Sequence, residues 1–176
     1  MDNLGKLDCI YARNCTVRRI DRDTAAAFLC ANHRMGDASS RYRIGLFVSR
    51  HTGKDEHALP AGTLVAVASF SSARRMKDGS RSFEWVRYAS LSGLRVLGGM
   101  GKVLEFFCRT TGPDDVMTYI PLPEENPSGT IPGGSYVSLG FCSEGVVTLP
   151  NGHSSLKLRF HPHPDISKVS GPQNPE

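Results

Sequence analysis

The hydrophobic pattern predicts short strands interrupted by two helices. Strands are predicted over residues 16–20, 42–48, 63–70, 82–91, 116–120 and 140–149, and helices over 24–33 and 102–109. Residues 63–70 give the clearest strand, because Val and Ala fill it as in a strand covered on both faces. The polar turn through Asp78 and Gly79 is typical of a link between antiparallel neighbours. The pattern therefore predicts an α+β fold with a mostly antiparallel sheet.

Local signals mark the ends of the predicted helices. Asp23 is predicted to cap the first helix, because its carboxylate can accept a hydrogen bond from a free N–H of the first turn. The second helix has its apolar residues on one face and ends at Gly112 and Pro113.

Length and composition indicate one compact domain. The chain has 176 residues, 39% of them hydrophobic and 22% charged, within the usual range for a single globular domain. We expect an N-terminal extension over residues 1–15, a single domain over 16–160 and a flexible tail over 161–176.

Cysteine content and apolar segments suggest the compartment. No apolar stretch approaches the about 20 residues of a membrane-spanning helix, and the first residues lack the apolar core of a secretory signal. Five cysteines without a C-x-x-C spacing do not suggest a disulfide framework. We expect a cytoplasmic protein that does not enter a membrane.

The net charge suits an anionic ligand. Twenty-one Lys and Arg residues against seventeen Asp and Glu residues leave +4, which is less than nucleic-acid-binding proteins usually carry. Arg41, Arg43, Arg74 and Arg75, with Tyr42 for stacking, nevertheless leave a nucleic-acid partner as an alternative.

The glycine-rich turn at residues 98–101 is the first candidate binding site. Gly98, Gly99 and Gly101 leave backbone N–H groups unshielded at the start of a helix, where the helix dipole favours a phosphate or diphosphate, and Lys102 adds a cation. The sequence fits neither a Walker A motif nor a Rossmann fingerprint. A plain tight turn is the alternative interpretation.

The order of elements, with two motifs, resembles the GNAT superfamily of N-acyltransferases. In that family a glycine-rich loop, [RQ]-x-x-G-x-[GA], begins the central helix, and here Arg95 and Gly98 match while Met100 replaces the small residue. The later Y-x-x-x-G-F motif is matched by Tyr136 with Gly140 and Phe141. The resemblance covers roughly residues 16–145 and implies a GNAT-like mixed, mostly antiparallel sheet flanked by helices in three layers.

The resemblance implies acetyl transfer from acetyl-CoA to an amine that the sequence does not identify. It implies that the turn binds the diphosphate and that the strand near Tyr88 and Leu91 polarises the thioester carbonyl. Expected cofactor-binding residues are Tyr88, Leu91, Arg95, Gly98, Gly99, Gly101 and Lys102. Loops 35–41 and 121–134 are expected to select the acceptor.

Three residues are candidates for proton transfer, each with a structural alternative. Tyr136 would protonate the departing thiolate, or else pack the last helix. Glu84 would be the base, or else pair with a cross-strand arginine, Arg74 or Arg87. His33 is a second candidate base, or else a helix C-cap favoured by the dipole.

Two further features leave other functions open. Relatives commonly carry an Asp after the strand that ends near Tyr119, whereas this chain runs through prolines 121, 123 and 127, so Glu124 or Glu125 would have to take its role. A catalytically inactive relative is therefore a further alternative. His161 and His163 lack a cysteine pair or an acid at ligand spacing, so no metal site is predicted.

Overall fold

The computed structural model describes residues 8–49, 59–123 and 133–163. Parts of the predicted extension, of the segment between the strands predicted at 42–48 and 63–70, of the proline-rich segment with Glu124 and Glu125, and of the C-terminal tail lie outside these residues. Within them, contacts group the chain into two compact units. The first unit comprises residues 8–49, 59–72 and 84–104, and the second comprises 73–83, 105–123 and 133–163.

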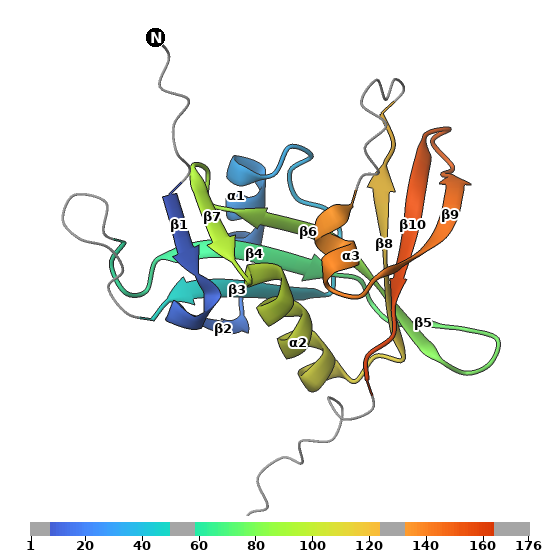
Figure 1. Ribbon diagram of the computed structural model, residues 1–176, viewed down its shortest axis with the longest axis horizontal. Coiled ribbons are helices and arrows are strands. Elements are labelled where there is room, and N and C mark those ends of the chain that lie inside the picture. Colours follow the sequence, from blue (N-terminus) through green and yellow to red (C-terminus); the bar gives the residue numbers. More distant parts are fainter. Residues whose placement is uncertain (1–7, 50–58, 124–132, 164–176) are drawn as a thin grey trace, which may run out of the picture. The chain divides into compact units, whose positions relative to one another are not determined.

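The first unit is built on an antiparallel sheet (Figure 1). Its strands β2 (Cys15–Arg19), β3 (Tyr42–Val48), β4 (Leu64–Phe70) and β6 (Arg81–Ser90) pair in that order. The first three residues of β6 belong to the second unit. The prediction is confirmed for these four strands to within one residue at each end.

A second, two-stranded sheet in the first unit is parallel and was not predicted. β1 (Asp8–Tyr11) pairs in parallel with β7 (Leu94–Leu97), and the 3-10 helix η1 (Ala12–Asn14) follows β1. Figure 1 shows β1 beside β7, just before α2 (Gly99–Thr111). Residues 8–15, expected in an extension, thus supply a strand next to the glycine-rich turn.

The helix α1 (Arg22–Asn32) covers one face of the first sheet. Ala25, Phe28 and Leu29 are buried with Val67 of β4 and Ala89 of β6. The prediction of Asp23 as the cap is wrong: Asp21 takes that position and accepts a 2.8 Å hydrogen bond from the Thr24 N–H. Asp21 lies three residues before Thr24, the spacing of an N-cap bond, whereas Asp23 already lies inside the first turn.

A bulge in β6 changes which side chains face α1. Ser69 pairs with Arg87 while the next residue, Phe70, pairs with Trp85, so Val86 is the extra residue. The Trp85 indole N–H donates to the Arg87 carbonyl at 3.0 Å and holds the bulge. As a result Glu84, Arg87 and Ala89 face α1, whereas Tyr88 faces the opposite side of the sheet.

The second unit is an antiparallel meander. β8 (Asp115–Pro121), β10 (Ser154–Phe160) and β9 (Cys142–Thr148) pair in that order, and β5 (Arg74–Arg75) pairs with the first residues of β6. The short helix α3 (Gly134–Ser138) precedes β9. β10 was not predicted. The fold class is confirmed, a mixed and mostly antiparallel sheet arrangement with helices, whereas the single-domain boundaries stay a prediction.

Charged side chains tie the strands of the second unit together. The Arg159 Nη1 of β10 contacts the Asp115 Oδ1 of β8 at 2.5 Å, and its Nε contacts the Glu144 Oε1 of β9 at 2.5 Å. Lys157 Nζ lies 2.8 Å from the same Glu144 carboxylate. Asp115 is only 5% exposed, so its charge depends on this arginine and on the Ser82 hydroxyl, which donates to it at 2.6 Å.

We expect Glu144 to make the second unit sensitive to acid. Its hydrogen bond with Arg159, followed in importance by that with Lys157, lowers its pKa from 4.5 to about 2. The ionised form therefore favours the folded state, with full stabilisation above pH 4.5 that is lost as the pH falls to about 2. The side chain is 36% exposed, and solvent screening reduces the contribution to about 1 kcal/mol.

Urea unfolding at pH 5 and at pH 2.5 checks this expectation. Between pH 5 and pH 2.5 the free energy of unfolding should fall in both proteins, and it should fall by about 1 kcal/mol less in Glu144→Gln than in the unchanged chain. Asp21 and Asp78, whose pKa values are also lowered by hydrogen bonds, stay in both proteins and cancel in the comparison. Equal losses in the two proteins would contradict the role of Glu144.

Candidate functional site

The glycine-rich turn becomes the first turn of α2. Gly98 has φ +77°, in the left-handed region that favours glycine, and the helix starts at the next residue. The first hydrogen bond of the helix runs from the Lys102 N–H to the Gly98 carbonyl at 3.1 Å. The N–H groups of Gly99, Met100 and Gly101 precede that bond and therefore have no acceptor within the helix.

Gly99 is required by close packing. A Cβ atom built on this buried residue would lie 2.5 Å from the Tyr88 hydroxyl oxygen and 3.0 Å from Val96 Cγ1. Tyr88 thus reaches from β6 to the start of α2, on the face of the sheet opposite α1. Two predicted cofactor-binding residues, Tyr88 and Gly99, are in this way brought together.

The Tyr88 hydroxyl is buried at this junction. Across the described residues it has no hydrogen-bond partner at ordinary distance. Burial raises the pKa of Tyr88, an effect that Ser90 on the same strand partly offsets. The phenol is therefore neutral near pH 7, and its oxygen lies against the backbone of the glycine-rich turn.

Lys102 binds backbone carbonyls beside the turn. Its ammonium donates to the Ala12 carbonyl at 2.9 Å and also to the Cys15 carbonyl. These bonds join α2 to η1 and the start of β2. An ammonium has three donors, and these two carbonyls account for two of them.

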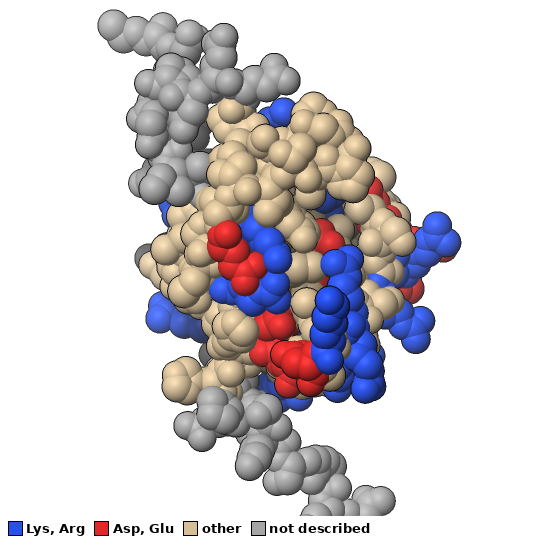
Figure 2. All heavy atoms as spheres, turned by 90° about the vertical axis from the view of Figure 1, so that its right-hand side faces the viewer, with Lys and Arg blue, Asp and Glu red and all other residues tan. Residues whose placement is uncertain are grey.

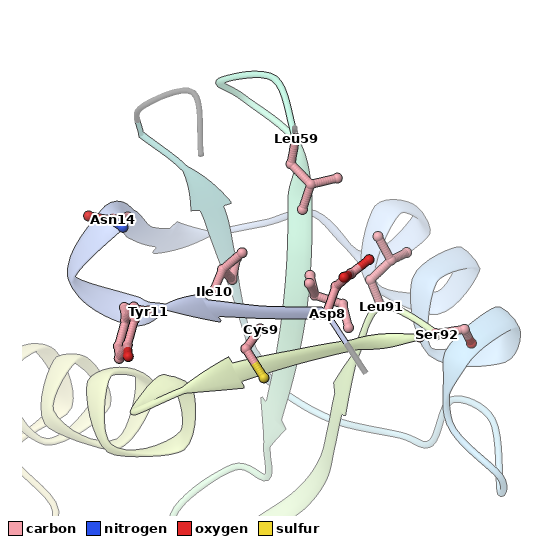
Figure 3. A pocket seen from close by; sticks show the side chains of 10 residues that line it. Asp8, Cys9, Ile10, Tyr11, Asn14, Leu59, Leu91 and Ser92 are labelled. Carbon is pink, nitrogen blue, oxygen red and sulfur yellow. The ribbon is translucent and has the colours of Figure 1, made fainter. Parts of the chain in front are cut away.

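The remaining predicted binding residues lie on β7 and just before it. Arg95 is exposed and pairs in the parallel ladder with Cys9. Leu91 packs against the α1 core and also lines a cavity of about 410 Å³. That cavity runs along β1, with Asp8, Cys9 and Ile10 on one side and Leu91 and Ser92 on the other (Figure 3). Residues 98–102 are not part of its wall.

His33 and Glu84 belong to the first unit and lie on the α1 side of the sheet. His33 is the C-cap of α1, and its Nδ1 accepts a 3.1 Å hydrogen bond from the Met35 N–H. Burial lowers the pKa of His33, and the nearby Arg87 guanidinium lowers it further. The imidazole is thus neutral near pH 7, as a proton acceptor must be. Glu84 is half-buried, and its backbone pairs with Ser71.

Tyr136 belongs to the second unit. It lies in the middle of α3, half-buried, with its ring 5.4 Å from that of Phe141 in an edge-to-face arrangement. Phe141 in turn stacks on Phe160 of β10 at 5.3 Å. The Tyr–Gly–Phe motif therefore anchors α3 to the sheet, whereas the catalytic role of Tyr136 stays a prediction.

Neither a membrane helix nor a metal cluster is found in the part of the chain that the structure describes. Across residues 8–49, 59–123 and 133–163, none of the helices combines the length and the apolar character needed to cross a membrane. The same residues contain no group of three or more His, Cys, Asp or Glu side chains placed to hold a metal ion.

Comparison with known proteins identifies the fold but no close relative. No family model matches the sequence, and no curated protein sequence matches it either. Three solved structures illustrate the structural likeness. The NatC complex bound to Gag peptide and CoA matches at 11% identity over 85% of this chain and 99% of that chain, with a TM-score of 0.55.

The other two structures come from bacteria. The spermidine/spermine N-acetyltransferase SpeG from Vibrio cholerae is 12% identical over 85% of this chain and 94% of that chain, with a TM-score of 0.54. A protein assigned to the GNAT family from Desulfovibrio desulfuricans is 13% identical over 84% and 98% of the two chains, with a TM-score of 0.52. The chain therefore has the fold of the GNAT superfamily of N-acyltransferases.

Proposed function

We propose that the protein is an N-acyltransferase that transfers an acetyl group from acetyl-CoA to an amine. The observation that carries the proposal is the start of α2, where three successive N–H groups have no acceptor in the helix. Backbone donors at the positive end of a helix dipole form a site for a phosphate or diphosphate. The fold supports this assignment, since the NatC structure of the same fold contains CoA.

The residues around the turn suit the diphosphate of CoA. Gly98, Gly99 and Gly101 place no side chain over the N–H groups, while Lys102 and the exposed Arg95 supply positive charge. The cavity along β1 and β7, of about 410 Å³, falls within the range of small-molecule sites. We assign that cavity to another part of the coenzyme.

The proposed reaction needs a base, an acid and a group that polarises the carbonyl. The amine nitrogen attacks the carbonyl carbon of the thioester, the carbon–sulfur bond breaks, and the sulfur leaves with the bonding electrons. Glu84, or alternatively the neutral His33, accepts the proton of the amine. Tyr136 gives a proton to the thiolate, and a backbone N–H of β6 near Tyr88 polarises the carbonyl.

Acceptor-dependent release of CoA tests the proposal. The protein is incubated with acetyl-CoA and, separately, with polyamines, amino acids and short peptides, and free CoA is measured by chromatography. Tyr136→Phe should lower kcat by about 10²-fold and leave KM for acetyl-CoA unchanged. Tyr119→Phe is the matched control, since the Tyr119 hydroxyl contacts the Met117 sulfur within β8. Release that no amine accelerates would count against the proposal.

The nucleic-acid alternative gains no comparable support. Arg19 lies over the Tyr42 ring at 5.2 Å and Arg18 over Phe47 at 3.9 Å, so the ring expected to stack on bases already carries an arginine. On the face in Figure 2, Lys and Arg side chains alternate with Asp and Glu side chains rather than forming an uninterrupted basic surface.

A further inference from the structure

A polar cavity in the first unit contains buried polar atoms without partners. Its volume is about 540 Å³, and Arg22, Asp37, Ser39, Ser40 and Arg43 line it together with Ala38. Three of these residues each bury a polar atom that has no hydrogen-bond partner among the described residues: Asp37 Oδ1, Ser40 Oγ and Arg43 Nε. Buried polar groups are nearly always paired, so three orphaned atoms in one cavity indicate a missing partner.

The strand register adds a fourth polar atom beside this cavity. Arg43 of β3 pairs with Ser69 of β4, and the Ser69 hydroxyl is also buried, with no hydrogen-bond partner in the described part of the chain. Since paired residues of neighbouring strands point to the same face, both side chains lie on the face that α1 covers.

The walls of the cavity are held in place independently of any ligand. The Arg87 Nε donates to the Gly36 carbonyl at 3.3 Å, and the Arg41 N–H donates to the Phe70 carbonyl at 2.8 Å. These bonds fix both ends of the 37–40 loop over the sheet. Arg22 opens α1, and the Ile20 N–H donates to the Arg43 carbonyl at 3.0 Å, which fixes the opposite wall. The site is therefore preorganised.

The charges around the cavity indicate a singly charged anion. The guanidinium groups of Arg22 and Arg43 and the carboxylate of Asp37 together leave one positive charge. A guanidinium presents N–H donors in the geometry of a carboxylate. The Asp37 carboxylate can only accept hydrogen bonds when ionised, so it requires a donor on the ligand and repels a phosphate dianion.

We propose that this cavity binds a small carboxylate that carries a hydroxyl or ammonium group on a neighbouring carbon. The carboxylate lies against Arg43 and Arg22, its donor group faces Asp37, and the Ser40 and Ser69 hydroxyls complete the hydrogen bonds. The cavity contains none of the residues proposed for catalysis or for coenzyme binding, although Asp37 and Ser40 belong to loop 35–41, which is expected to select the acceptor. Binding of the carboxylate can therefore be measured without acetyl-CoA.

Calorimetry with the full chain tests this inference. The probes are glycine, serine and aspartate as amino acids, glycolate and lactate as hydroxy acids, acetate as a carboxylate without a donor, and inorganic phosphate. We expect at least one amino or hydroxy acid to bind with a Kd below 1 mM and at least about tenfold more tightly than acetate or phosphate. If amino acids bind more tightly than hydroxy acids, the donor group on the ligand is an ammonium. If hydroxy acids bind more tightly, it is a hydroxyl.

Variants connect binding to the cavity. Asp37→Asn and Arg22→Met should each weaken the best probe about tenfold or more, and Arg22 is exposed, so its replacement leaves folding intact. Arg74→Met removes an equal charge from β5 of the other unit and should leave binding unchanged. Ser40→Ala should keep or raise the Tm of the free protein, by up to about 3 °C, because it removes an orphaned hydroxyl.

Three results would overturn the inference. One is the absence of carboxylate binding at 10 mM by a folded protein, with ordered water alone satisfying the three atoms. Another is phosphate binding that equals the best carboxylate and tightens in Asp37→Asn. The last is carboxylate binding that Asp37→Asn and Arg22→Met leave unchanged.

Discussion

Arg159→Met should destabilise the protein by about 3–5 kcal/mol, the usual cost of leaving a buried charge without its partner. Asp115 is 5% exposed, and among the described residues the Ser82 hydroxyl is the side-chain donor that would stay after this change. Methionine preserves much of the apolar stem of arginine, so lost packing contributes little. Since small proteins are stable by about 5–15 kcal/mol in total, the loss is a large share of the whole.

Denaturant unfolding measures this effect, with Lys157→Met as the matched control. Lys157 lies on the same strand and pairs with the partly exposed Glu144, so its replacement should cost no more than about 1 kcal/mol. Adding Asp115→Asn to Arg159→Met should restore part of the stability, because the uncompensated charge is gone. A cost below about 1 kcal/mol for Arg159→Met would show that Asp115 does not depend on the arginine.

Gly99→Ala should have the second largest effect, a net destabilisation of about 1–3 kcal/mol. The added methyl group would lie 2.5 Å from the Tyr88 hydroxyl oxygen and 3.0 Å from Val96 Cγ1. Val96 Cβ, at 3.2 Å, is fixed to the backbone of β7, so the start of α2 must move. We expect acetyl-CoA to bind at least about tenfold more weakly as a result, because the N–H groups move with the turn.

Thermal unfolding and calorimetry check this prediction together. Tyr88→Phe in the same chain should restore part of the lost stability, since it removes the closest atom. Alone, Tyr88→Phe should be neutral or slightly stabilising, because it removes a buried hydroxyl that has no hydrogen-bond partner at ordinary distance among the described residues. Gly134→Ala is the control, since a Cβ atom there meets no atom of the described residues within 4 Å. A Gly99→Ala protein with unchanged stability and affinity would contradict the packing argument.

The regular strands of the first unit could be predicted because a buried strand appears in the sequence as an uninterrupted run of apolar residues. The apolar run of β4 and the boundaries of β3 follow from the sequence alone. By contrast β1 and β7 have four residues each and pair in parallel across more than eighty residues of chain. Strands this short and this far apart in sequence leave no local hydrophobic pattern that predicts them. β10 did carry a signal, because Leu156, Leu158 and Phe160 alternate with Lys157 and Arg159.

The turn before α2 could be predicted from the sequence, whereas the side-chain contacts around it could not. The sequence shows several glycines just before a helix, and these glycines predict a turn. The structure has that turn at Gly98. The packing of Tyr88 under Gly99 depends on the bulge at Val86, which changes the face that Tyr88 occupies. The cavity at Asp37, Ser40 and Arg43 joins a loop to a strand through long-range pairing, which composition does not reveal.

Calorimetric comparison of acetyl-CoA with S-acetylpantetheine, which lacks the diphosphate and the adenosine 3′-phosphate attached to it, tests the central claim most directly. If the N–H groups of Gly99, Met100 and Gly101, which have no acceptor within the helix, bind the diphosphate, acetyl-CoA should bind with a Kd below 1 mM and at least about tenfold more tightly than S-acetylpantetheine. Equal affinities for the two compounds, or no heat with acetyl-CoA at millimolar concentration, would contradict the claim.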